Sequence, residues 1–519
     1  MKYVLILLLI VIVTKLDAQI TFNKRLQFGC SNTTMTGLEV TDSCYYITGG
    51  ARDTVHCIFG SYFMQMDSLG NILSNKFYST PQHRLEQWHS CLQTDIDGNL
   101  IVAGEAFDSN IISSVLIKYT PQGDTLWTRR YKNQTNLQHF LRSDDMFIAP
   151  DSSYILTGQM NSGYNNGFQV LNIERDGNIR WHKTVGEGHD FHGKQRLIPL
   201  QDGFLVGYIH SNANLTSMNY SVFCNIKKND YSGNLLWEWQ NDTSIQLLGA
   251  NDLIQTKDKG WVVGTAIGKE FLTTGGTSSI LGHDCYVFKL DSARNWLWGT
   301  PLRAYSYSQY AKIMKIIEQP DRSLMTFGIT TDTFPVNGTT IVQWHAMVAK
   351  LSADGDSLWS HEYYYTQQNG AEYEIFDVEQ THDGGYLIAG QAKFSGQGPY
   401  QQGWLLKLDQ HGCLVPGCHL PDTTTSILPI HAQPQAQLKL YPNPAVDYLN
   451  VWYRNKEVGE ELTFRILDAQ GRVLQSHTAR DISDKTYIFP VWELLGGWYV
   501  LEVRQDAVLV GSEVFVKGE

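Results

Sequence analysis

The chain has 519 residues, of which 42% are hydrophobic and 12% aromatic, with 45 glycines and a formal net charge of −12. It has no basic run and no aromatic residues interleaved with Lys or Arg, which disfavours nucleic acid as a partner. Beyond the first residues no stretch approaches the length of a membrane-spanning helix, so we expect no transmembrane segment, and no motif indicates a cofactor.

Residues 1–18 have the composition of a secretory signal peptide. A basic start at Lys2 is followed by an apolar stretch over residues 4–13 and by a small residue at Ala18. This order is typical of a cleaved leader. We expect the mature, exported chain to begin at Gln19.

One phrase recurs along residues 19–418. Its clearest copy is Gly177-Asn178-Ile179-Arg180-Trp181, and related copies end at Trp127, Trp237, Trp298 and Trp359. The Trp positions lie roughly 54 to 61 residues apart, which is typical of solenoids and propellers. A copy without Trp is Gly70-Asn71-Ile72-Leu73.

Each repeat also contains short apolar runs bounded by Gly and Asp, such as Tyr386-Leu387-Ile388-Ala389-Gly390, which occurs in seven versions. Runs of this kind predict buried strands, and Gly, Asn and Asp between them predict hairpin turns. No long segment has a 3.6-residue apolar stripe. Each repeat is therefore predicted to be a four-stranded antiparallel sheet, the unit of a β-propeller.

The last repeat lacks its Trp strand, and the mature N-terminus offers a replacement. Residues 22–29 align with residues 181–186, with Phe22 in the Trp position. We predict an all-β fold in which residues 19–418 form a seven-bladed β-propeller, closed by this N-terminal strand beside residues 404–408. The alternatives are an open array of hairpins, or a ring of six or eight blades.

Eight cysteines in an exported chain permit disulfides. Cys413 and Cys418 enclose a Leu-Val-Pro-Gly turn and are the predicted pair. The partners of the other six cannot be deduced, namely Cys30, Cys44, Cys57, Cys91, Cys224 and Cys285. Zinc is disfavoured, because no close Cys pair is matched by a second Cys or His pair.

The composition changes after Cys418. Residues 419–437 are polar, contain Pro and lack aromatics, which predicts an exposed linker. Residues 438–519 then hold six or seven short strand-like runs separated by turns, which predicts a small Ig-like β-sandwich.

The residues of this tail resemble the type A C-terminal sorting domain of the type IX secretion system of Bacteroidetes. The resemblance is carried by residues 441–445, 467–473, 495–500 and 513–517. It implies a route through the periplasm and recognition by the outer-membrane secretion machinery. The implied product is secreted or surface-displayed, and in many members of the family a sortase processes it. The implied sorting-signal residues are Pro442, Asn443, Pro444, Asp468, Gly471, Gly497 and Tyr499.

The repeats look like the propeller regions that accompany this tail in Bacteroidetes, a resemblance that implies fold more than activity. We expect ligands on the face that carries the connections between repeats and between each repeat's second and third strands. Aromatic faces there suit a glycan or a protein. The candidates are Tyr305, Tyr307, Tyr310, Trp344, Tyr363, Tyr364, Tyr365, Tyr373 and Tyr400, and the alternative is that such residues pack against their own sheets.

Catalytic motifs are weak. The Gly-Asn-x-x-Trp phrase loosely resembles the Asp-box of sialidases and the docking repeats of quinoproteins, but inter-blade packing of each Trp explains it as well. His189 and His192 lack a third ligand, and we assign no metal. The leading hypothesis is a non-catalytic binding protein; the alternatives are a polysaccharide hydrolase, which requires carboxylates converging at the channel mouth, and an envelope scaffold.

Overall fold

The computed structural model describes residues 20–28, 32–52, 59–78, 84–86, 91–108, 111–132, 140–161, 167–185, 191–192, 195–213, 220–242, 247–268, 271–274, 277–280, 283–302, 311–336, 339–364, 371–394, 401–415, 418, 437–454, 462–468, 472–479, 485–505 and 508–518. Regular structure in these residues consists of strands, and none of them lies in a helix. The predicted all-β class is confirmed. The predicted leader and linker lie outside the described residues.

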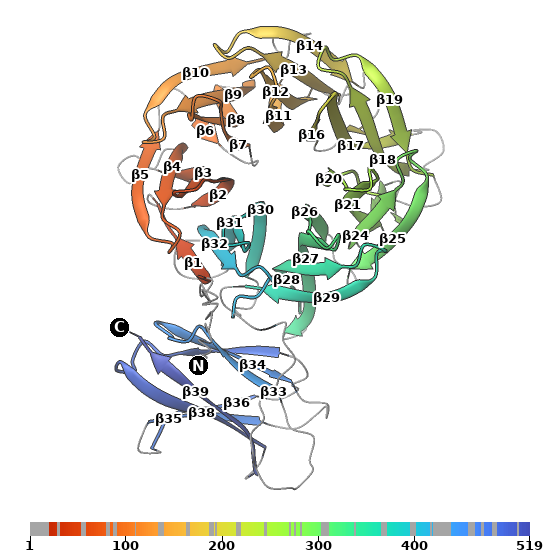
Figure 1. Ribbon diagram of the computed structural model, residues 1–519. Coiled ribbons are helices and arrows are strands. Elements are labelled where there is room, and N and C mark those ends of the chain that lie inside the picture. The colour runs from red at the N-terminus through yellow and green to blue at the C-terminus, as the bar shows by residue number, and fades with distance from the viewer. Residues whose placement is uncertain are drawn as a thin grey trace, which may run out of the picture.

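Antiparallel sheets of four main strands follow one another along the chain and surround a central opening (Figure 1). They resemble propeller blades. The first three contain β2 (Thr34–Val40), β3 (Tyr45–Arg52), β4 (Phe59–Met66) and β5 (Ile72–Tyr78); β6 (Arg84–Glu86), β7 (Leu92–Thr94), β8 (Leu100–Asp108), β9 (Ile111–Tyr119) and β10 (Thr125–Tyr131); and β11 (Phe140–Ile148), β12 (Tyr154–Asn161), β13 (Phe168–Ile173) and β14 (Ile179–Val185).

The next sheets have the same order, with the innermost strand first in sequence. They contain β15 (Phe191–His192), β16 (Arg196–Leu200), β17 (Gly203–Ala213), β18 (Tyr220–Asn229) and β19 (Leu235–Gln240); β20 (Asp252–Gln255), β21 (Trp261–Gly268), β24 (His283–Leu290) and β25 (Trp296–Leu302); β26 (Lys312–Glu318), β27 (Leu324–Val336), β28 (Thr339–Leu351) and β29 (Ser357–Tyr363); and β30 (Glu372–Gln380), β31 (Tyr386–Lys393) and β32 (Gln401–Leu408). A separate hairpin joins β22 (Phe271–Thr274) to β23 (Thr277–Ile280).

The sheet of β30, β31 and β32 receives its outermost strand from the other end of the chain. β1 (Phe22–Leu26) pairs antiparallel with β32, with Phe22 opposite Lys407 and Leu26 opposite Gly403. The predicted pairing beside residues 404–408 is confirmed. Asn23 strengthens the join, because its Oδ1 accepts a hydrogen bond from Trp404 Nε1 at 2.6 Å.

The recurring phrase encodes a turn followed by a β-bulge. Its glycine has positive φ, as at Gly177 (91°) and Gly355 (92°), a conformation that only glycine adopts at little cost. The register then shifts just before the Trp, so that the preceding residue bulges outward, as Leu358 does before Trp359. The Trp itself points back toward the core.

Four aromatic residues of the phrase pack on the glycine turn of the following sheet, whereas the turn that follows the sheet of Trp127 meets Arg129 at Gly177. A Cβ placed on the glycine would lie 2.5 to 3.0 Å from the ring in the pairs Trp181 with Gly233, Trp298 with Gly355, Trp359 with Gly412, and Phe22 with Gly70. In the degenerate copy Arg294 replaces the glycine and lies 4.8 Å over the Trp237 ring. The phrase is thus an inter-sheet contact, and Phe22 fills the Trp position as predicted.

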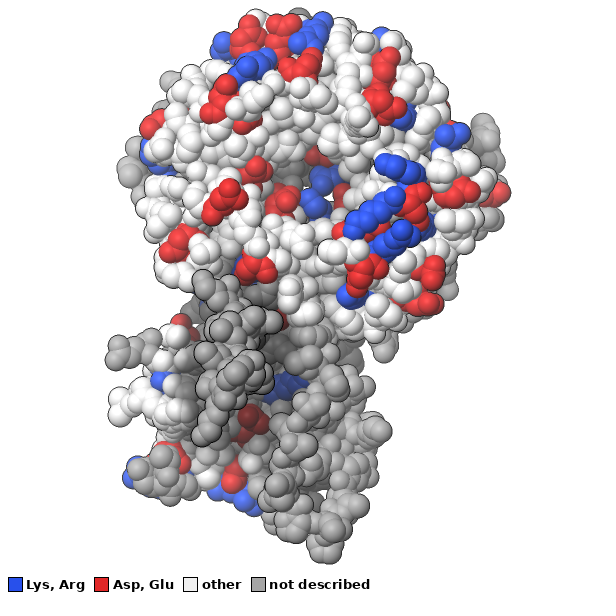
Figure 2. All heavy atoms as spheres, viewed as in Figure 1, with Lys and Arg blue, Asp and Glu red and all other residues white. Residues whose placement is uncertain are grey.

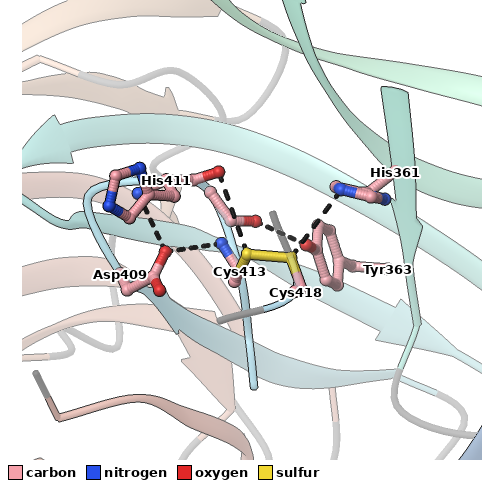
Figure 3. The surroundings of a disulfide bond; sticks show 7 residues. His361, Tyr363, Asp409, His411, Cys413 and Cys418 are labelled. Atoms are coloured by element: carbon pink, nitrogen blue, oxygen red, sulfur yellow. Dashed lines mark hydrogen bonds between the residues drawn. A yellow bond between two sulfur atoms is a disulfide. The ribbon is translucent and has the colours of Figure 1, made fainter. Parts of the chain in front are cut away.

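The predicted disulfide between Cys413 and Cys418 is confirmed, with their Cα atoms 5.7 Å apart (Figure 3). Nearby, the Tyr363 hydroxyl donates a hydrogen bond to the carbonyl oxygen of Gly412 at 2.5 Å. This bond ties β29 to the turn that follows β32. Cys44, Cys91, Cys224 and Cys285 are buried, and Cys30 and Cys57 lie outside the described residues.

The tail consists of two sheets that share one core. The first sheet contains β33 (Gln437–Tyr441), β34 (Tyr448–Arg454) and β37 (Lys485–Pro490), and the second β35 (Leu462–Leu467), β36 (Val473–Ala479), β38 (Gly497–Gln505) and β39 (Val508–Lys517). Val451, Phe464 and Leu501 are among the buried side chains between them. The Tyr364 hydroxyl donates to the carbonyl oxygen of Thr486 in β37 at 3.4 Å, which joins the tail to the ring.

Candidate functional site

The innermost strands enclose a cavity of about 440 Å³ at the centre of the ring. Figure 2 shows acidic and basic atoms around this opening. Because every inner strand runs in the same direction, side chains at one level of the ring converge there. The charged lining residues are Glu39, Asp145, Arg196, Asp252, Lys315, Asp377 and Glu379.

Five of these charges occupy the same position in successive sheets. Each lies opposite the fourth residue of the apolar run in the second strand of its own sheet, as Asp145 lies opposite Thr157. The five residues are Asp145, Arg196, Asp252, Lys315 and Asp377. At three of the positions the register shifts immediately before the charged residue. Acidic and basic residues therefore alternate around this part of the ring.

The aspartates at this level bind the backbone of the next sheet. Each accepts a hydrogen bond from an N–H group of the following inner strand: Asp145 from Leu197 at 2.8 Å, Asp252 from Ile316 at 2.7 Å, and Asp377 from Leu38 at 2.9 Å. The last bond joins the sheet of β30 to that of β2. A buried carboxylate bonded in this way holds two sheets in fixed register.

The basic residues lie between the carboxylates. Arg196 is 3.2 Å from both Asp145 and Asp252, and Lys315 Nζ is 3.1 Å from Glu379. Burial alone would lower the pKa of Arg196, but the attraction of Asp145 and Asp252 outweighs it and raises the pKa. The pKa of Lys315 is raised for the same reason, chiefly by Glu379. Both cations stay charged.

The carboxyl group of Glu39 lies in the cavity beside the next sheet. Its Oε1 accepts a hydrogen bond from the Thr94 N–H at 3.1 Å. Burial, with smaller repulsion from Glu379 and Asp377, raises the pKa of Glu39 to about 7. Burial also raises the pKa of Glu379, although Lys315 opposes the shift. Near neutral pH Glu39 can therefore hold or release a proton.

The cavity lies at the other end of the inner strands from the face chosen by sequence analysis. Glu39, Thr94 and Glu379 stand in the last residues of β2, β7 and β30, close to the turns into the second strands. That face was predicted from loop length and aromatic content. Neither property detects charged side chains that converge from several inner strands.

The predicted aromatic site is only partly described. Tyr305, Tyr307, Tyr310, Tyr365 and Tyr400 lie outside the described residues.

The other predicted aromatics pack against the protein. Tyr373 is fully buried and contacts Trp404, and Tyr363 is 8% exposed. Trp344 and Tyr364 are half-buried. Lys393 lies 5.7 Å over the Trp344 ring. Burial makes Tyr363 and Tyr373 packing residues, because no ligand can stack on a covered ring.

The predicted sorting residues have clear structural roles in the tail. Both prolyl bonds of Tyr441-Pro442-Asn443-Pro444 are cis. Asn443 Oδ1 accepts the Val516 N–H at 2.8 Å, which fixes this turn to β39. Asp468 accepts the Arg472 N–H at 2.9 Å across its hairpin turn.

Two further sorting residues stand in β38. Gly497 lies opposite Lys517 in β39. The Tyr499 hydroxyl donates to the Leu495 carbonyl oxygen at 2.7 Å. Gly471 lies outside the described residues.

The charged residues that line the cavity were not predicted, although the sequence contains a signal for them. Asp145, Asp252 and Asp377 each stand nine residues before the aromatic residue that opens the second strand, namely Tyr154, Trp261 and Tyr386. Aligning the repeats on those aromatics would have revealed the recurring aspartate. In the described residues no group of three or more His, Cys, Asp or Glu side chains is arranged to hold a metal ion.

Residues 439–517 match the family described as the secretion system C-terminal sorting domain. The predicted sorting domain is confirmed, and it supports secretion or cell-surface localisation through the secretion machinery. A search of curated protein sequences finds no significant match. Within the described residues no helix is long and apolar enough to cross a membrane.

Several solved structures are distantly similar. A polysaccharide lyase, Uly1, is 8% identical, with 72% of this chain and 90% of that chain covered and a TM-score of 0.45. The GH93 α-L-arabinofuranosidase of Fusarium graminearum is 12% identical, with 65% and 96% covered and a TM-score of 0.41. A protein of unknown function from Bacteroides caccae is 12% identical, with 52% and 82% covered and a TM-score of 0.30.

Proposed function

We propose that this protein is a secreted or surface-displayed, non-catalytic β-propeller that binds glycan or protein and is exported through its C-terminal sorting domain. The family match over residues 439–517 carries the export half of the proposal. Residues 1–18 serve as the signal peptide that brings the chain to the periplasm, and residues 419–437 link the propeller to the Ig-like sorting domain at 438–519. A surface sortase is the proposed processing partner.

The proposed propeller spans residues 19–418 and has seven blades. Support comes from the sheet that β1 completes and from the aromatic-on-glycine contact that Phe22 makes with Gly70. Support also comes from the hydrogen bond between Leu38 and Asp377, which links the innermost strands of the first and last sheets.

The bonding of the cavity carboxyls favours binding over catalysis. Each of the five accepts a backbone N–H or pairs with a cation: Glu39, Asp145, Asp252, Asp377 and Glu379. Groups bonded in this way hold neighbouring sheets together. A hydrolase needs two carboxyls that are free to face a substrate.

A glycan array probed with the mature protein tests this function. Tyr364→Ala and Tyr305→Ala serve as variants of the predicted aromatic site. We expect selective glycan binding by the wild-type protein that the variants weaken. Absence of binding by the wild type would leave a protein ligand as the remaining form of the proposal, to be tested with immobilised cell-surface proteins.

A second candidate function, polysaccharide hydrolysis, has one observation in its favour. The carboxyl of Glu39, with its pKa of about 7, stands in the same cavity as Glu379 and could act as a general acid. Release of reducing sugar from a polysaccharide panel, abolished by Glu39→Gln, would replace the binding proposal with this one.

A further inference from the structure

The outer face of the second tail sheet carries an exposed apolar strip. Register places Val473, Leu467, Val500 and Val514 opposite one another on four adjacent strands, and Trp498 opposite Val516 beside them. Trp498 is 68% exposed, Val514 44% and Val473 38%. We call these six residues the apolar strip.

The strip is not a part of the tail core that happens to be uncovered. The core of this sheet lies on its opposite face, where Phe464, Leu501 and Phe515 are at most 1% exposed. Strand residues alternate between faces, so Val500 and Val514 point outward beside these buried neighbours.

Charge borders the strip along the same face. Glu502 pairs with Arg504 at 3.0 Å and with Arg465 at 4.0 Å, two residues further along β38 and β35. Contiguous apolar surface with a polar rim marks an interaction site in soluble proteins. A face that contacts only solvent would carry polar residues along its whole length.

The location of the strip indicates its partner. The tail contacts the ring through β37 of the other sheet, at Thr486, and Figure 1 shows β35 and β38 on the side of the tail away from the ring. The strip is therefore accessible while the tail remains joined to its cargo. A sorting domain must present a surface to the machinery that reads it.

We propose that the apolar strip is the docking surface for an apolar site on the secretion machinery. This inference rests on the proposed export through the sorting domain and specifies which face is read. Trp498 is the central anchor, because it combines the largest side chain of the strip with the greatest exposure.

The test uses the full-length protein in a bacterium that has this secretion system. The double variant Trp498→Ser/Val514→Ser removes the strip, and Leu236→Ser/Leu358→Ser is the matched control, since those leucines are 51% and 54% exposed on the ring. Loss of an anchor residue weakens docking, so we expect at least about a tenfold fall in the extracellular fraction. The control should be exported like the wild type.

The outcomes separate the two levels of the proposal. Wild-type export of the double variant would overturn the docking surface. Wild-type export of a chain truncated after residue 437 would overturn the sorting function itself. Because all substituted residues are exposed, thermal unfolding of the purified variants should match the wild type. If folding suffers, Trp498→Arg alone replaces the double variant. A concentration-dependent dimer that Trp498→Ser dissolves without reducing export would assign the strip to self-association and overturn the proposal.

Discussion

At the scale of single residues, the inner ring shows how a propeller uses charge to fix its sheets. Asp145 and Asp252 both contact Arg196, which lies half-buried between them. Buried carboxylates are costly unless cations and N–H groups surround them. Asp145 and Asp252 each have both kinds of partner, and Asp377 accepts hydrogen bonds from two N–H groups.

Arg196→Met removes the cation and leaves two buried carboxylates. We expect a loss of about 3–5 kcal/mol in the free energy of unfolding, measured by urea denaturation at pH 7. Arg175→Met is the control, because Arg175 and Asp97 form an exposed pair that solvent screens, so its loss should change stability little. Equal effects of the two substitutions would contradict the proposed role of Arg196.

The carboxyl of Glu39 predicts a pH dependence. Its pKa in the folded state is about 7, above the ordinary value of 4.5. Folding therefore tightens proton binding. The stability that this group contributes is present in full below about pH 4.5 and is lost as pH rises through 7.

Glu39→Gln retains an acceptor for the Thr94 N–H and removes this titration. The unfolding free energy of the wild type, relative to the variant, should fall by roughly 2.5 kcal/mol between pH 5 and pH 8. Urea denaturation of both proteins over this range measures it. A difference that does not vary with pH would show that the pKa of Glu39 is not raised by folding.

At the scale of elements, the Gly-Asn-x-x-Trp phrase joins a turn, a bulge and an inter-sheet contact. From the sequence, the phrase is compatible with a ligand motif or with a role in packing. The contacts on Gly233, Gly355 and Gly412 support packing. The glycine serves two purposes: it permits positive φ, and it leaves room for the ring of the preceding sheet.

Gly355→Ala tests the second purpose, with Gly98→Ala as its control. Both glycines have positive φ, at 92° and 76°. A Cβ at Gly355 would lie 2.5 Å from Trp298 Cδ2, whereas a Cβ at Gly98 would meet no described atom within 4 Å beyond its chain neighbours.

We expect Gly98→Ala to cost about 1–2 kcal/mol from backbone strain, and Gly355→Ala to cost about 1–3 kcal/mol more from the clash. Differential scanning calorimetry gives both values. The packing role of the phrase would fail if the two costs were equal.

At the scale of the whole molecule, the repeats in the sequence predicted most of the fold, because turn glycines and apolar strands recur at fixed spacing. Even the partner of β1 was predictable, since Phe22 stands where the other repeats have Trp. The disulfide and the sorting tail followed from short local motifs.

The cavity was less predictable, because its lining side chains come from strands that are far apart in the sequence. Glu39 and Glu379 stand 340 residues apart in the chain, and their shared cavity depends on closure of the ring. Burial of Tyr373 was unpredictable for a related reason: whether this residue is a ligand-binding ring or a core ring depends on what covers it, and a single sequence does not record this.

The N-terminal strand completes the last sheet, and we expect this closure to make the ring one cooperative unit. Hydrogen–deuterium exchange of the mature protein tests the closure by comparing the amides of Phe22–Leu26 with those of Gly403–Lys407. We predict strong protection of the β1 amides that face β32 and of the β32 amides, lost together as denaturant is added. Rapid exchange of every amide in residues 22–26 while residues 403–407 stay protected would contradict this closure.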